Sequence, residues 1–172
     1  MIKKLLIANR GEIACRIIHT CRKLNIRSVA VYSDADAESM HVLYADEAVH
    51  LGGSRVKESY LNMEAVLQAA KDTGADAIHP GYGLLSENPV FAERVVEEGI
   101  IFVGPEAEVI KQMGDKIQAR TAMETAGVPV VPGITLDTLE ESHVIKAGRA
   151  VGYPLMIKAA AGGRYRYAEN RK

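Results

Sequence analysis

Two lysines, Lys116 and Lys158, lie where a positive charge is energetically unfavourable unless an anion binds beside it. Lys158 follows three apolar residues, Leu155 to Ile157, in an expected strand, and burying an unpaired ammonium group is unfavourable. Lys116 lies at the start of an expected helix, where the helix dipole disfavours a cation. A nucleotide phosphate would supply the missing negative charge at both places. The alternative is a surface lysine whose ammonium group reaches water, and the two positions alone do not separate these interpretations.

Two expected strand-to-helix connections combine glycines with polar side chains. Asn9-Arg10-Gly11-Glu12 follows the first apolar run, and residues 79–88 (HPGYGLLSEN) follow a later one. Ligands collect beyond the carboxyl ends of parallel strands, and a glycine before a helix allows a sharp turn toward N–H groups that attract anions. The second connection departs from the dinucleotide pattern G-x-G-x-x-G, because Ser86 stands where the last glycine belongs. Taken singly, both connections are also compatible with tight structural turns.

The elements that must position these residues alternate along the chain. Short apolar runs predict strands at 5–8, 28–32, 48–51, 77–79 and 100–103, and helical patterns lie at 13–24, 63–71 and 89–98. Strands separated by helices form right-handed βαβ units, so the sheet is parallel and covered on both faces. The sequence therefore predicts an α/β fold with a Rossmann-like parallel sheet flanked by helices.

A differently built region is predicted after Gly104-Pro105. Helical patterns cover 107–113, 115–126 and 138–151, and a further apolar strand covers 155–159. The prolines at 129 and 132 keep residues 127–133 extended, because proline is not tolerated in a helix interior.

The composition excludes several classes of protein. Of 172 residues, 48 % are hydrophobic and 25 % are charged, with 21 Lys+Arg against 22 Asp+Glu, which is typical of a globular domain. The balanced charge and the 5 % aromatic content speak against nucleic acid as a partner. Cys15 and Cys21 lie on different faces of one predicted helix, as expected of reduced packing residues. With no signal peptide and no apolar run of about 18 residues, we expect a cytoplasmic protein without a membrane partner.

Six segments in order resemble biotin carboxylase, the ATP-grasp subunit or domain of the biotin-dependent carboxylases. They are residues 6–14 (LIANRGEIA), 59–62 (SYLN), 78–88 (IHPGYGLLSEN), 102–105 (FVGP), 113–116 (MGDK) and 152–159 (GYPLMIKA). The resemblance implies an N-terminal pre-ATP-grasp domain over residues 1–111 and the incomplete start of an ATP-grasp domain over residues 112–163. It also implies an ATP-dependent ligase that forms a C–N bond, with ATP, bicarbonate, biotin and Mg²⁺ or Mn²⁺ as substrates and cofactors.

The resemblance assigns roles to particular residues. Lys116 and Lys158 match lysines that contact the nucleotide, and Gly162 and Gly163 match the beginning of the glycine-rich run that closes over the triphosphate. Tyr82 and Gly83 match the border of the biotin site. The helix that carries Arg16 matches the surface through which bacterial biotin carboxylases form homodimers, although its charged residues are equally compatible with a solvated face.

The reaction that the family carries out requires further proteins. Family members convert ATP and bicarbonate to carboxyphosphate and then carboxylate N1 of biotin on a biotin carboxyl carrier protein. A carboxyltransferase completes the reaction, for example in an acetyl-CoA carboxylase of fatty acid synthesis or in a propionyl-CoA or pyruvate carboxylase. The sequence does not distinguish among these acyl acceptors.

The resemblance stops near Gly163. Residues 164–172 (RYRYAENRK) depart from the family, and we expect them to be disordered, because their charged residues bury little. The family places its metal-ligating glutamates and its bicarbonate-binding residues further along the chain. We therefore expect no catalytic and no metal-binding residue in these 172 residues, and we expect this polypeptide alone to be inactive. Two alternatives are another ATP-grasp ligase and a non-catalytic dimerisation or binding module.

Overall fold

The computed structural model describes residues 1–136, 138–158 and 165–168. It divides into two compact units, Met1–Lys111 and Gln112–Lys172. The side chains of Lys116, Lys158 and residues 165–168 also lie outside the described part.

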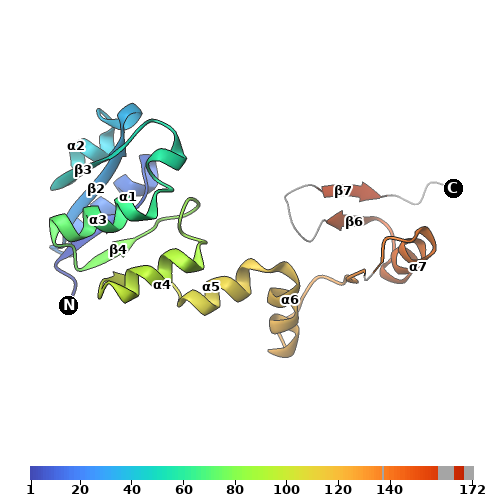
Figure 1. The fold of residues 1–172 in the computed structure, drawn as a ribbon. Coiled ribbons are helices and arrows are strands. Elements are labelled where there is room, and N and C mark those ends of the chain that lie inside the picture. Colours follow the sequence, from blue (N-terminus) through green and yellow to red (C-terminus); the bar gives the residue numbers. More distant parts are fainter. Residues whose placement is uncertain (137, 159–164, 169–172) are drawn as a thin grey trace. The chain divides into compact units, whose positions relative to one another are not determined.

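The first unit is built on a parallel sheet of five strands (Figure 1). In chain order the strands are β1 (Lys4–Ile7), β2 (Arg27–Ser33), β3 (Glu47–Gly52), β4 (Ala77–His79) and β5 (Ile101–Phe102). They lie in the order β3-β2-β1-β4-β5, and every neighbouring pair is parallel. This arrangement confirms the predicted α/β fold with a helix-flanked parallel sheet.

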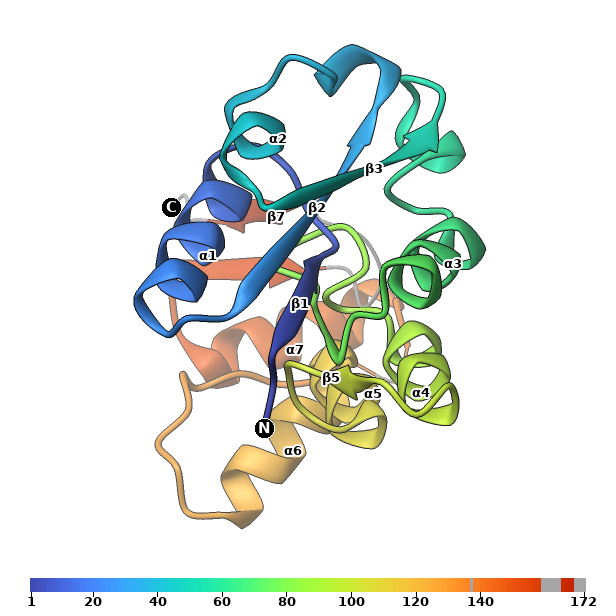
Figure 2. The ribbon, with the colours of Figure 1, turned by 90° about the vertical axis from the view of Figure 1, so that its left-hand side faces the viewer.

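Helices cover both faces of this sheet (Figure 2). One face carries α1 (Gly11–Lys23) and α2 (Met40–Tyr44), and the other carries α3 (Met63–Thr73) and α4 (Pro89–Glu97). Because both faces are covered, β1 is a continuous apolar run whose residues 5–7 are all buried, as is typical of a central parallel strand.

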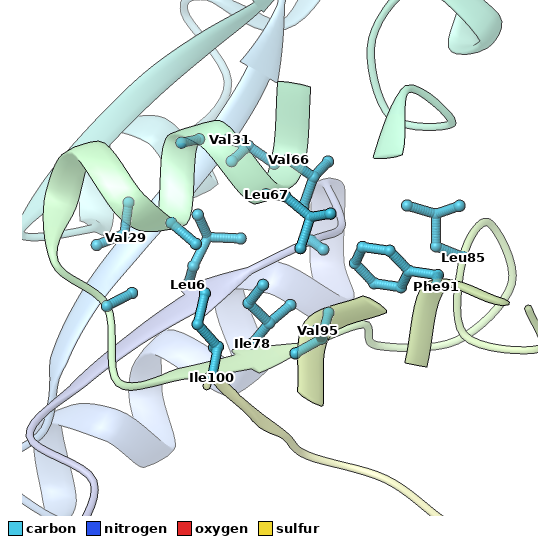
Figure 3. Packing of buried hydrophobic residues seen from close by; sticks show 14 of the residues in the cluster. Leu6, Val29, Val31, Val66, Leu67, Ile78, Leu85, Phe91, Val95 and Ile100 are labelled. Carbon is cyan, nitrogen blue, oxygen red and sulfur yellow. The ribbon is translucent and has the colours of Figure 1, made fainter. Parts of the chain in front are cut away.

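Two apolar clusters hold the helices on the sheet. The smaller joins Leu5 and Ile7 to Ile17 and Ile18 of α1. The larger, shown in Figure 3, joins alternate sheet residues to apolar residues of α3 and α4 and of the loops; its labelled members are Leu6, Val29, Val31, Val66, Leu67, Ile78, Leu85, Phe91, Val95 and Ile100. Alternation along a strand sends neighbours to opposite faces, which explains why Leu5 and Leu6 belong to different clusters.

Local capping explains where two of the helices begin and end. Asn62 Oδ1 accepts a hydrogen bond from Ala65 N at the start of α3, and Asn88 Oδ1 accepts one from Phe91 N at the start of α4. Pro89, the first residue of α4, needs no backbone donor at that position. Gly74 ends α3 with φ +63°, a conformation that glycine adopts without strain. The sequence did not predict α2.

The described part of the second unit contains helices and a strand pair. Helix α5 (Ala107–Gly114) spans the division between the units, and α6 (Lys116–Thr125) and α7 (Glu141–Val151) follow it. Strand β6 (Leu155–Lys158) pairs antiparallel with β7 (Tyr165–Ala168). The structure thus differs from the disordered tail expected for 164–172, because Tyr165–Ala168 completes a backbone hydrogen-bond ladder with β6 and tyrosine favours strands. Residues 164 and 169–172 lie outside the described part.

Candidate functional site

The carboxyl ends of β1 and β4 lie side by side at the centre of the sheet. Ile7 pairs with His79, and Ala8 N donates to His79 O at 2.9 Å. The chain leaves β1 toward α1 on one face and leaves β4 toward α4 on the other. Such a change of direction between adjacent parallel strands is where ligands bind in open α/β sheets. We call the two connections, residues 8–12 and 80–88, the switch-point loops.

Asn9 joins the two switch-point loops. Its side-chain Nδ2 donates to the carbonyl oxygens of Pro80, at 2.7 Å, and Tyr82, at 2.9 Å. Its Oδ1 accepts from Arg10 N at 2.9 Å. Only 4 % of Asn9 is exposed, so both amide hydrogens and the amide oxygen are used inside the protein. This side chain therefore fixes the backbone of residues 80–82.

Gly81 lies directly against the Asn9 side chain. Its φ of +67° falls in the left-handed region, and a Cβ atom built on it would lie 2.7 Å from Asn9 Nδ2. Gly81 N donates to His79 Nδ1 at 3.0 Å, which places the proton of the neutral imidazole on Nε2. Burial lowers the pKa of His79 below its ordinary value, so this neutral form is the one that the loop stabilises.

Tyr82 connects the second switch-point loop to the first turn of α1. Its hydroxyl donates to Glu12 Oε1 at 2.6 Å, and 60 % of the residue is exposed. The hydrogen bond to Glu12 and the charge of its carboxylate raise the pKa of Tyr82 above its ordinary value. Gly83 follows with φ +62° and open space around the position of a Cβ atom. The structure thus places Tyr82 and Gly83 at the switch point, and their role at a biotin site stays a prediction.

A partly buried polar cluster lies beside the switch-point loops. Asp36 Oδ2 accepts from the hydroxyls of Tyr60 and Ser33, both at 2.7 Å, and Arg10 Nη1 lies 3.3 Å from the same oxygen. The Arg10 guanidinium also lies 5.2 Å from the centre of the Tyr60 ring. This cluster ties the side chain of Arg10, next to Asn9, to the segments that follow β2 and β3.

The charges of this cluster shift two pKa values. Burial disfavours the Asp36 carboxylate, but the hydrogen bonds from Tyr60, Ser33 and Arg10 outweigh it and lower the pKa of Asp36. Burial and the hydrogen bond to Asp36 raise the pKa of Tyr60 to about 12. Both groups therefore keep their present protonation states across the neutral range.

Replacing Tyr60 with phenylalanine is expected to lower the free energy of unfolding by about 1–3 kcal/mol at neutral pH, because Asp36 loses a donor and the buried Ser33 N–H loses its acceptor. The stabilisation from Asp36 is present above its ordinary pKa of 3.8 and is lost as the pH falls through the lowered folded-state value. The variant should therefore lose less stability on acidification below about pH 4. Urea denaturation across pH 2–7 measures both effects.

Tyr32 to Phe is the matched control for this measurement. The Tyr32 ring is half-buried beside His50, with 5.4 Å between the ring centres, and its hydroxyl makes no hydrogen bond within the described residues. An equal loss of stability in the two variants would contradict the role given to the Tyr60 hydroxyl.

A shallow hollow of about 730 Å³ lies between α1 and α2. Its lining includes Glu12, Cys15 and Arg16 from the α1 side and Met40 and Tyr44 from α2. Arg16, predicted to lie on a dimerisation surface, is therefore on the α1 face that borders α2.

The predicted nucleotide residues all belong to the second unit. Lys116 is the first residue of α6, whose N-terminus is capped by Asp115 Oδ1 through Ile117 N and Gln118 N at 2.9 and 3.0 Å. Lys158 is the last residue of β6. Gly162 and Gly163 lie outside the described residues, so the nucleotide site stays a prediction.

The described residues offer no metal centre. Among residues 1–136, 138–158 and 165–168, no group of three or more His, Cys, Asp or Glu side chains gathers as metal ligands would. Within the same residues, no helix combines the length and the apolar character needed to cross a bilayer.

Comparison with known families gives a match for each unit. Residues 1–110 match the family described as "Biotin carboxylase, N-terminal domain". Residues 115–166 match the family described as "Carbamoyl-phosphate synthase L chain, ATP binding domain".

Individual relatives extend these matches across most of the chain. The biotin carboxylase of Halalkalibacterium halodurans is 60 % identical over 163 residues, which are 95 % of this chain and 36 % of that relative. The mitochondrial propionyl-CoA carboxylase alpha chain of Rattus norvegicus is 51 % identical over 160 residues, 93 % of this chain and 22 % of the relative. The chain thus spans about a third or less of the length of these curated relatives.

Solved structures show the same similarity in three dimensions. A biotin carboxylase–β-γ-ATP complex from Campylobacter jejuni superposes with a TM-score of 0.90 at 43 % identity, covering 99 % of this chain and 39 % of that one. The biotin carboxylase domain dimer of the Hydrogenobacter thermophilus 2-oxoglutarate carboxylase, in complex with MgADP, ADP and bicarbonate, gives 0.87 at 46 % identity, covering 99 % and 38 %.

Proposed function

Because the chain belongs to the biotin carboxylase family, as its N-terminal domain and the start of its ATP-grasp domain, we propose that it takes part in the ATP- and bicarbonate-dependent carboxylation of biotin on a carrier protein. The observation that carries the proposal is the 60 % identity to a biotin carboxylase over 163 residues. This match is longer than either unit, so it includes residues of both. Since these residues are about a third of that relative, we propose that they contribute to the reaction together with further catalytic residues.

We propose that the two units divide the work. The first unit, residues 1–111, borders the biotin site through Tyr82 and Gly83. The second, residues 112–163, contributes Lys116 and Lys158 as point charges on the nucleotide phosphates, and Gly162 and Gly163 to the loop over the triphosphate. The match of residues 115–166 to an ATP-binding domain supports this assignment. In the reaction, bicarbonate attacks the γ-phosphate with ADP as leaving group. The resulting carboxyphosphate gives up its carboxyl group to N1 of biotin, which loses its proton, and inorganic phosphate is released.

The chain's own switch-point loops support the biotin assignment of the first unit. Asn9 holds the backbone of Pro80 and Tyr82, and Glu12 holds the Tyr82 hydroxyl. A ligand that meets this edge therefore finds an aromatic ring in a fixed position. Mg²⁺ or Mn²⁺, when bound, would neutralise phosphate charge. We propose none of the described residues as a ligand of that metal ion.

The relatives belong to different carboxylases, so the family alone does not specify the partners or the acyl acceptor. The relatives include biotin carboxylases and propionyl-CoA carboxylase alpha chains, so we propose a carrier protein and a carboxyltransferase as partners without choosing an acetyl-CoA carboxylase of fatty acid synthesis over the others. The dimer in one related structure supports self-association, and we propose the surface of α1 that carries Arg16 as the interface. A cytoplasmic location stays a prediction from the sequence.

A chimera tests the proposed function. Residues 1–163 replace the aligned segment of the Halalkalibacterium halodurans biotin carboxylase, and release of ADP is measured with and without bicarbonate and free biotin. We expect turnover that requires both. Lys158→Gln should raise the KM for ATP by about tenfold, the value of one charged hydrogen bond, whereas Lys146→Gln on α7 should not change it.

Three results would contradict the proposal. ADP release from the folded chimera without any dependence on biotin would favour another ATP-grasp ligase. Self-association of the folded chimera with neither ATP binding nor ADP release would favour a dimerisation module. An unchanged KM for ATP in Lys158→Gln would remove the nucleotide role of that lysine. Circular dichroism, and a second chimera that exchanges residues 1–111 only, separate loss of folding from loss of function.

A further inference from the structure

Tyr82 is held at both ends by one short segment of chain. Its backbone carbonyl accepts from Asn9 Nδ2 at 2.9 Å, and its hydroxyl donates to Glu12 Oε1 at 2.6 Å. Asn9 and Glu12 belong to the connection between β1 and α1 and to the first turn of α1, whereas Tyr82 lies about 70 residues further along the chain. The β1–α1 connection therefore determines the position of both the backbone and the side chain of Tyr82.

The two ends of Tyr82 differ in how firmly they are held. The Asn9 side chain is buried and makes three hydrogen bonds, so the backbone position is secured independently of the ring. The residue is 60 % exposed, and within the described residues its hydroxyl has no hydrogen-bond partner other than Glu12. Removing the Glu12 carboxylate would thus leave the backbone in place and free the ring to rotate.

Glu12 is well placed to hold the ring. It lies in the first turn of α1, where the positive end of the helix dipole favours a carboxylate. The phenol donates its one hydrogen to Glu12, which fixes the orientation of the ring. Much of the residue remains exposed to solvent. A fixed aromatic surface at a switch point is suited to packing against a ring of low polarity.

We infer that Glu12 is a positioning residue that fixes the Tyr82 ring so that its open surface borders the fused ring system of biotin. The inference rests on the proposed function, because it takes biotin as the ligand at this edge of the sheet. Glu12 touches neither biotin nor nucleotide in this assignment and acts through Tyr82 alone.

The first test follows the phenol and needs no activity. Tyrosine labelled with ¹³C at Cζ reports the pKa of each phenol in the 172-residue chain, and Tyr82→Phe assigns the signal. In the unchanged chain the pKa of Tyr82 should lie above its ordinary value of 10, and in Glu12→Ala it should fall to that value. Tyr60, with a pKa of about 12, should not move and serves as the internal reference.

The second test measures biotin binding in the chimera of residues 1–163. Glu12→Ala should raise the KM for free biotin by about three- to tenfold, the value of one aromatic packing contact, with kcat and the KM for ATP unchanged. Glu12→Gln keeps an acceptor oxygen and should restore most of the biotin affinity. Glu93→Ala removes an exposed carboxylate from α4 and is the matched control without effect.

The outcomes distinguish this inference from the proposed function. An unchanged phenol pKa in Glu12→Ala would overturn the contact, and an unchanged KM for biotin despite a lowered pKa would overturn the positioning role. A kcat that falls together with the rise in KM would also overturn it, because Glu12 would then act in the chemical step. If the unchanged chimera shows no dependence on biotin, the proposed function fails, while the phenol titration still decides whether Glu12 holds Tyr82.

Discussion

Replacing Phe91 with alanine is expected to lower the free energy of unfolding by about 3–5 kcal/mol, as is usual when a large buried aromatic side chain is removed. Phe91 is fully buried in the cluster between the sheet and the helices α3 and α4. Its ring meets Phe102 edge to face, with 6.1 Å between the ring centres. The lower free energy of unfolding therefore has two sources, the cavity left by the ring and the lost contact with Phe102. Urea denaturation monitored by circular dichroism measures it.

The neighbouring residue gives the control for Phe91. Val90 lies on the same helix but is 51 % exposed, so Val90→Ala should change the stability by less than about 0.5 kcal/mol. Phe91→Leu fills part of the cavity and should cost less than Phe91→Ala, which keeps the comparison measurable if the alanine variant does not fold. Equal losses in Val90→Ala and Phe91→Ala would show that the cluster does not depend on this ring.

Gly81→Ala is expected to destabilise the first unit by about 2–4 kcal/mol, the sum of a left-handed backbone and a disturbed buried hydrogen-bond network. Gly81 and Gly83 have nearly the same φ, +67° and +62°, but only Gly81 would place a Cβ atom against Asn9. Gly83→Ala should therefore show the backbone cost alone, about 1–2 kcal/mol. Denaturant unfolding of both variants separates the two contributions.

Hydrogen exchange adds a local measurement to this pair of variants. The Gly81 amide donates to His79 Nδ1, so its protection should fall in Gly81→Ala and remain close to normal in Gly83→Ala. Equal destabilisation by the two substitutions would contradict the tight contact between Gly81 and Asn9.

The sequence predicted the sheet of the first unit more fully than its small helices. The central strands β1, β2 and β4 were recognisable because their residues, such as Leu6 and Ile78, are buried and form short unbroken apolar runs. Helix α2 has only five residues, and its Met40, Leu43 and Tyr44 are exposed whereas His41 is buried. A helix of that kind has no apolar stripe that periodicity could detect.

The two switch-point loops were predicted from the sequence, but the contacts that join them were not. Both switch-point loops were recognised from their glycines and polar residues, and Tyr82 and Gly83 from the family resemblance. The role of Asn9 was missed, because its partners Pro80 and Tyr82 are more than 70 residues away and meet it only once β4 pairs with β1. A buried-strand pattern predicts which residues form strands, but it does not give the order of the strands. The one available signal was an asparagine directly after the first apolar run, where a buried amide must find partners.

The central place of β1 also affects how the chain folds during synthesis. Strand β1 can pair with β2 as soon as β2 has been synthesised, but the other neighbour, β4, is completed only at His79. Until then one side of β1 carries unpaired backbone groups and uncovered apolar side chains, which is the kind of edge that pairs with foreign strands. Closing a loop of this length is entropically slow. A nascent chain that pauses before residue 77 therefore presents a surface for chaperones, and the arrival of Ala77–His79 is the step that removes it.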